Sequence, residues 1–174
     1  MTQHQTSMLS GRLIRVIEGQ AEELTRGTVE ILEHSPRTPA YHRVPYHELH
    51  DRVYAIYHDL GKWLEERTDG TIQGWYNGLG KQRFDERIPL ADVLWALVLI
   101  KHHLRERVAA STTADSAIEL YRKQELDQLI GQFFDRALCY TAEGYQRAAS
   151  PQGEQWVGVR HEAAGDSSRL PGAY

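Results

Sequence analysis

Histidine is the residue type in this sequence that most invites a chemical role, because a neutral imidazole binds transition metals and also transfers protons near neutral pH. Nine histidines occur among 174 residues. Two of them, His47 and His50, lie three residues apart with Glu48 between them. The helix motif of zinc proteases needs two histidines four residues apart, on one face of the helix. This pair therefore does not predict a zinc-protease site.

A polar stripe appears when the segment around these histidines is drawn as an α-helix. With Leu49 set at zero and 100° per residue, four polar residues lie at about 140° to 200°: His47, Asp51, Tyr54 and His58. The simplest interpretation is a solvated helix face that holds no metal. Two alternatives stay open: a metal or ligand stripe that another helix completes, and a contact with another subunit.

A second histidine pair, His102 and His103, follows an apolar run. Adjacent helical residues point about 100° apart, so the two rings cannot face one site. We expect a ring packed at the edge of the core, with its nitrogens hydrogen-bonded inside the chain. The alternative is that His103 contacts a ligand in a pocket, or a haem in a globin-like fold.

Other catalytic patterns are weak. Carboxylate-bridged metal centres in helical bundles need Glu-x-x-His on two helices, and the stretch from Glu30 to His34 does not have that spacing. Cys139 stands in an apolar helical stretch, which predicts a buried and inert thiol. Gly78-Leu79-Gly80 lacks the lysine and serine of a phosphate-binding loop. We therefore expect no catalytic residues, no metal and no cofactor.

Composition narrows the classes of protein further. Hydrophobic residues make up 41% and charged residues 25%, which is typical of a globular domain. The net charge of −4 provides no attraction for nucleic acid or an anionic membrane surface. A single cysteine excludes an intrachain disulfide. No apolar run is long enough for a membrane span and residues 1–10 do not resemble a signal peptide, so we expect a cytoplasmic protein.

Helical periodicity dominates the elements that must position these residues. It predicts helices over residues 7–34, 45–67, 69–86, 89–110 and 115–148, with the first break at Pro36 and Pro39. The apolar run Val93 to Ile100 predicts that the fourth helix is central and has no side facing water. The fold class is all-α, a five-helix bundle or a globin-like packing without haem. Residues 1–149 form the single helical domain, and residues 150–174, rich in glycine and charge, form a disordered tail.

The fifth helix carries an apolar arc wider than a small bundle needs. Four residues on one side of this helix can supply the core, namely Leu126, Ile130, Phe133 and Ala137. Phe134, Leu138 and Tyr145 lie about 80° to 120° around the helix from Leu126. Monomers seldom expose such a patch, so we predict a symmetric homodimer with this flank at its interface. The alternative is that the first helix or the loop around Tyr41 covers the flank within one chain.

Four short motifs in order resemble a known family. They are Leu60-Gly61-Lys62-Trp63-Leu64, then Tyr76-Asn77-Gly78-Leu79-Gly80 with Arg83, then Ile88-Pro89-Leu90 with Trp95-Ala96-Leu97, and last Gln132 to Ala137 with Tyr140 and Gly144-Tyr145. Over residues 10–148 the chain resembles the N-terminal regulatory domain of RsbT co-antagonist proteins of the RsbRD type, which is also found at the N-terminus of bacterial histidine kinases. The resemblance implies a cytoplasmic helical sensory module, often dimeric and related in outline to globins without haem. It implies no catalytic residues. Such domains usually precede a kinase or another output domain, whereas only the tail follows Ser150 here.

These observations favour a non-enzymatic bacterial signalling module that acts through a protein partner in stress or two-component signalling. A small-molecule or haem-binding sensor is the alternative. A metal-dependent helical-bundle enzyme is the third reading, which the absence of a paired ligand motif disfavours. The residues expected to touch a ligand or a partner are His47, Asp51, Tyr54, His58, His103, Phe134, Leu138 and Tyr145.

Overall fold

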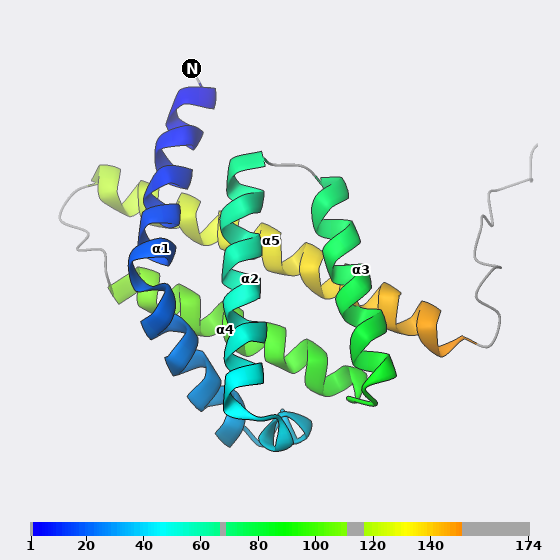
Figure 1. Cartoon of the computed structure of the whole chain (residues 1–174). Coiled ribbons are helices and arrows are strands. Elements are labelled where there is room, and N and C mark those ends of the chain that lie inside the picture. Colours follow the sequence, from blue (N-terminus) through cyan, green and yellow to red (C-terminus); the bar gives the residue numbers. More distant parts are fainter. Residues whose placement is uncertain (1, 67–68, 111–116, 151–174) are drawn as a thin grey trace, which may run out of the picture.

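The computed structural model describes residues 2–66, 69–110 and 117–150. These residues form five α-helices and one short 3-10 helix, and they contain no strand (Figure 1). In chain order the elements are α1 (Thr2–His34), η1 (Pro39–Arg43), α2 (Tyr46–Glu66), α3 (Asp69–Asp85), α4 (Leu90–Ala110) and α5 (Ala117–Ala149). The all-α, five-helix prediction is confirmed, and the globin-like arrangement stays a prediction. Of the predicted tail, residues 150–174, all but Ser150 lie outside the described residues.

Local sequence signals account for most of the helix ends. The carbonyl oxygen of Pro45 accepts the first α2 hydrogen bond from the Leu49 amide at 3.0 Å, as suits a proline just before a helix. The break after α1 contains η1, which the two prolines had indicated only as a loop. Its start is held by Asp92 in the first turn of α4, whose carboxylate accepts the Ala40 amide at 2.8 Å. This bond connects the segment between α1 and α2 to the first turn of α4.

The helices form two groups that cross. In Figure 1, α1, α2 and α3 run roughly alongside one another, and α4 and α5 cross them. α1 packs on α2 and α4, α3 packs most closely on α5, and α4 packs on α5. One continuous hydrophobic cluster fills the space between the two groups. The fold is therefore held both by consecutive helices and by helices distant in sequence, above all α3 and α5.

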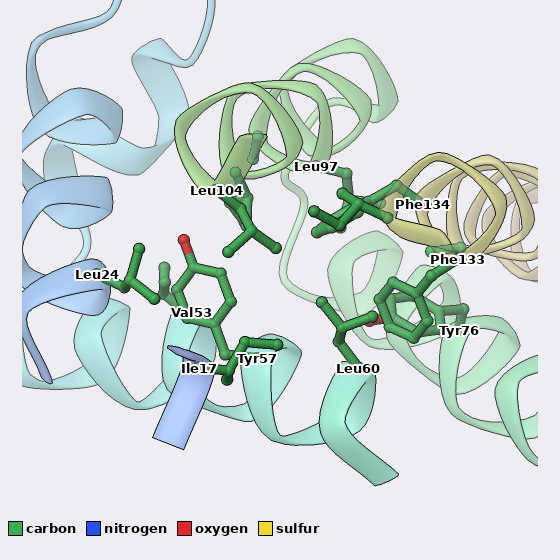
Figure 2. Packing of buried hydrophobic residues seen from close by; sticks show 14 of the residues in the cluster. Ile17, Leu24, Val53, Tyr57, Leu60, Tyr76, Leu97, Leu104, Phe133 and Phe134 are labelled. Carbon is green, nitrogen blue, oxygen red and sulfur yellow. The ribbon is translucent and has the colours of Figure 1, made fainter. Parts of the chain in front are cut away.

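Aromatic rings form the part of the core where α2, α3 and α5 meet (Figure 2). The Phe133 ring lies 5.7 Å from the rings of Trp63 and Tyr76 and 5.2 Å from Phe134. Edge-on ring contacts of this kind add roughly 0.5–1.5 kcal/mol each to the energy of burial. Phe133 thus joins three helices in one cluster.

α4 is only partly the central helix that its apolar run predicts. Leu97 is 2% exposed, and α4 contacts α1, α3, α5 and η1. Trp95, however, is 36% exposed, so the expectation of a helix with no side facing water is wrong. A continuous apolar run covers the whole circumference of α4, whereas its neighbours cover only part of it. The guanidinium of Arg37 lies over the Trp95 ring at 4.0 Å and shields this side.

The flank of α5 that was predicted to form a dimer interface is largely covered within the chain. Phe134 is fully buried in the core, so its assignment to an interface is wrong. Leu138 and Tyr145 are half-buried, and the Tyr145 hydroxyl donates to the Ile88 carbonyl at 3.0 Å. The Tyr145 ring also stands edge-on to Phe84 of α3. Close packing of α3 on α5 covers the Tyr145 end of the flank, and dimerisation itself stays a prediction.

No helix within the described ranges is long and apolar enough to cross a membrane.

Candidate functional site

Three aromatic rings follow one another along the outer side of α2. Tyr46, His50 and Tyr54 are spaced four residues apart, which places them one above another on a helix surface. The Tyr46 and His50 ring centroids are 6.0 Å apart, and those of His50 and Tyr54 are 6.4 Å apart with planes only 11° from parallel. Tyr46 is 50% exposed and Tyr54 is 47% exposed. We call these three residues the aromatic row.

Two carboxylates flank the aromatic row. Nε2 of His50 lies 3.3 Å from Oε1 of Glu22 on α1, and Nδ1 lies 3.7 Å from Oδ1 of Asp51. The Glu22 and Asp51 side chains are 78% and 83% exposed, while that of His50 is 20% exposed. The row therefore combines two open tyrosine rings, one sheltered histidine and two solvated negative charges.

The buried face of α2, which adjoins the aromatic row, determines where the row points. Leu49, Val53 and Leu60 are buried, as the amphipathic pattern requires. The Tyr57 hydroxyl shares a 2.7 Å hydrogen bond with the hydroxyl of Thr28, buried between α2 and α1. Burial raises the pKa of Tyr57 to about 12, so the phenol stays neutral. Together the apolar face and this bond set the rotation of α2 about its axis and turn the aromatic row outward.

The polar stripe predicted on α2 is exposed as expected. His47, Asp51, Tyr54 and His58 all face solvent. Within the described part of the chain, no three His, Cys, Asp or Glu side chains are grouped so that they could hold a metal ion. The sequence reasoning missed Tyr46 and His50 because it looked directly opposite Leu49, whereas the row lies toward α1. Aromatic residues at every fourth position were the signal that could have found them.

His103 lies far from the aromatic row in the sequence and packs between α4 and α1. Its ring fits against Gly27, where a Cβ on the glycine would meet Nε2 at 3.0 Å. Burial and the neighbouring charge of Arg107 lower the pKa of His103, which Glu106 partly offsets. The sequence predicts a ring packed at the edge of the core, and the half-buried ring of His103 agrees with this. Cys139 is exposed rather than buried, because position 139 falls on the outer side of α5.

A partly buried ion-pair network joins α2 to the end of α3. The Arg83 side chain is only 5% exposed, and its Nη1 lies 2.9 Å from each oxygen of Glu86. Nη1 of Arg52 lies 3.0 Å from Oε2 of the same carboxylate. Beside this network, burial raises the pKa of Tyr41 against the lowering effect of both arginines. Glu86 thus connects α2 and α3 through two guanidinium groups.

The space beside this network is small. Arg52, Arg83, Tyr41 and aliphatic side chains of α1, α2, α3 and α4 enclose about 20 Å³. One water molecule needs about 10–15 Å³ on this measure, whereas pockets for organic ligands run to about 300–1,000 Å³. In this conformation the cavity has the size of a water site.

A larger and more open groove lies between α4 and α5. It measures about 370 Å³, and its lining includes Arg105, Val108, Leu120, Asp127 and Ile130. The Arg105 guanidinium pairs with the Asp127 carboxylate across the two helices. Next to the groove, Ile118 and Tyr121 are 65% and 59% exposed. This groove is in the size range of small-molecule sites.

The fold and these surfaces define a class of protein, an all-α bundle with an outward aromatic face on one helix. Comparison with known proteins adds no particular family to this class. No family model matches the chain, and no curated protein or solved structure matches it.

Proposed function

We propose that this protein is a non-enzymatic regulatory module that binds another protein through the aromatic row on α2. The observation that carries the proposal is the half-exposed pair Tyr46 and Tyr54, aligned on one helix face with His50 between them. From the resemblance of the sequence to RsbRD-type regulatory domains, we further propose that the module acts in bacterial stress or two-component signalling.

The physical support for the proposal is that the rings of Tyr46 and Tyr54 expose apolar area to water, which a partner would bury. Tyrosine is enriched where proteins meet, because its ring buries a large apolar area while its hydroxyl keeps a polar partner. A tyrosine also loses little conformational freedom on binding compared with a long flexible side chain. Tyr46 and Tyr54 stand on a long helix whose adjoining face is buried, so they are held in place before a partner arrives.

The test compares the wild-type chain, as bait, with two variants that lose exposed tyrosines on different helices. The full chain would be used as wild type, as Tyr46→Ser with Tyr54→Ser on α2, and as Tyr121→Ser on α5, where Tyr121 is 59% exposed. Partners captured from the native cell would be quantified by mass spectrometry. We expect at least one partner that the α2 variant loses and the α5 variant keeps. Retention of every partner by the α2 variant, with its helical circular dichroism unchanged, would contradict the proposal.

A second candidate function is small-molecule sensing in the groove between α4 and α5. Its size of about 370 Å³ and its mixed lining, apolar with the Arg105–Asp127 pair, favour it. Amide NMR spectra during a screen of metabolite-sized compounds would test this candidate. Shifts clustered on Val108 and Ile130 would support it, and shifts confined to α2 would not.

A further inference from the structure

We infer that the aromatic row recognises a cationic segment of its protein partner, one that presents arginine or lysine side chains. The inference rests on the proposed function and names the chemistry of the partner. It follows from two features of the same surface, the half-exposed rings of Tyr46 and Tyr54 and the carboxylates of Glu22 and Asp51 beside them.

The ring faces are one half of a cation site. The face of an aromatic ring carries partial negative charge and attracts a guanidinium or ammonium group placed over it within about 6 Å. The other half is the flanking acid, because a carboxylate attracts the same cation and forms paired hydrogen bonds with a guanidinium. Glu22 reaches the row from α1, and Asp51 reaches it from α2. An anionic segment of a partner would meet two like charges on this surface.

The same chain already uses this chemistry on its other surface rings. Arg37 lies 4.0 Å above the ring of Trp95, and Nζ of Lys62 lies 5.3 Å from the ring centre of Trp75. Trp95 is nonetheless 36% exposed, so its cover is partial. Among the described residues, no lysine or arginine is placed over Tyr46 or Tyr54, and the ring beside both is that of His50. A cation of the partner would cover these tyrosine rings as the Arg37 guanidinium covers the Trp95 ring.

Spacing along α2 limits the shape of the partner. Tyr46 and Tyr54 are eight residues apart, which corresponds to about 12 Å along a helix axis. Two cations at a similar separation would sit over both rings at once. A helix with basic residues eight positions apart has this geometry, with its own axis along α2.

The first experiment compares three designed peptides that differ only in charge. The alanine-based helical peptides have equal length and carry two arginines, two citrullines or two glutamates, each pair eight positions apart. Citrulline keeps the shape of arginine and removes its charge. Each peptide would be titrated into the isotopically labelled full chain, and amide shifts along α2 would be followed by NMR. We expect the arginine peptide to bind about fivefold more tightly than the citrulline peptide, the factor that a contact of about 1 kcal/mol provides.

Variants of the chain then locate the contact. Tyr54→Leu keeps an apolar side chain and should weaken arginine-peptide binding by about fivefold. Asp51→Asn should weaken it by about twofold to fivefold, the range for an exposed ion pair. The matched controls are Tyr121→Leu and Glu30→Gln, which change an exposed tyrosine and an exposed carboxylate elsewhere. Both controls should bind as wild type does.

Each outcome has a definite meaning. Equal binding of the arginine and citrulline peptides, or no effect of Tyr54→Leu, overturns the cationic partner. Tighter binding of the glutamate peptide that still depends on Tyr54 also overturns it, while the proposed docking function stands. The bait comparison decides the proposed function separately, because it makes no assumption about charge.

Discussion

Gly144 of α5 lies directly against the backbone of Asn77 in α3. A Cβ built on Gly144 would stand 2.1 Å from the Asn77 carbonyl oxygen, and one on Gly80 would stand 2.1 Å from that of Thr141. No side chain fits at either place, so the two helices touch backbone to backbone. This contact explains why α3 packs so closely on α5, and why Phe84 of α3 reaches the ring of Tyr145.

The glycine contact predicts a large and local effect on stability. Gly144→Ala should force α3 and α5 apart and lower the free energy of unfolding by about 3 kcal/mol, the upper range for overpacking. Gly74→Ala is the control, because nothing lies within 4 Å of its added methyl group and alanine favours the helix by about 1 kcal/mol. Urea unfolding measures both. Equal midpoints for Gly144→Ala and wild type would show that the close contact does not form.

The end of α3 predicts a stabilising substitution. Arg87 has φ 60°, a left-handed conformation in which a side chain costs roughly 1–2 kcal/mol. The Ile88 amide bonds the Arg83 carbonyl at 3.0 Å and the Arg87 amide bonds that of Phe84 at 2.9 Å, the pattern of a helix end that favours glycine. Arg87→Gly should raise the free energy of unfolding by about 1 kcal/mol, and Arg87→Ala should not. Thermal unfolding distinguishes the two variants, and a gain in the alanine variant would argue against backbone strain.

Asp59 predicts a pH dependence of stability. Burial raises the pKa of this carboxyl from 3.8 to about 6, against the opposing influence of His58 and Lys62. Between about pH 4 and pH 6 the folded chain therefore holds a proton that the unfolded chain has released, so the free energy of unfolding falls as pH rises through this window. Asp59→Asn should remove this part of the dependence. Urea unfolding at several pH values, with exposed Asp51→Asn as control, measures the difference; identical profiles for Asp59→Asn and wild type would contradict it.

Dimerisation can be tested without reference to the partner. The sequence predicts a homodimer, so sedimentation equilibrium at tens of micromolar should give about twice the chain mass of 20.0 kDa. Since Phe134 is buried, only the half-buried Leu138 and Tyr145 of the predicted flank can contribute. Leu138→Glu should then dissociate the dimer and keep its helical circular dichroism. A species of 20.0 kDa for the wild type would reject the dimer.

The local sequence pattern was sufficient to predict the five α-helices, though not η1. Pro36 and Pro39 end one helix, Pro45 precedes the next, and the spacing of Leu49, Val53 and Leu60 identifies the buried side of α2. These features depend on residues within a turn or two of one another, so a sequence displays them directly. For the same reason the exposure of His47 and His58 followed from their place opposite Leu49.

Tertiary structure decided which of two plausible surfaces is covered and which is open. The apolar arc of α5 predicted that Phe134 faces outward, but the helices that pack on α5 bury Phe134 completely. The periodicity of one helix says which residues share a face, whereas the neighbour that meets this face is set by packing between segments distant in the chain. The same holds for the aromatic row. Its carboxylate Glu22 is 28 residues from His50 in sequence and comes beside it only because α1 packs along α2.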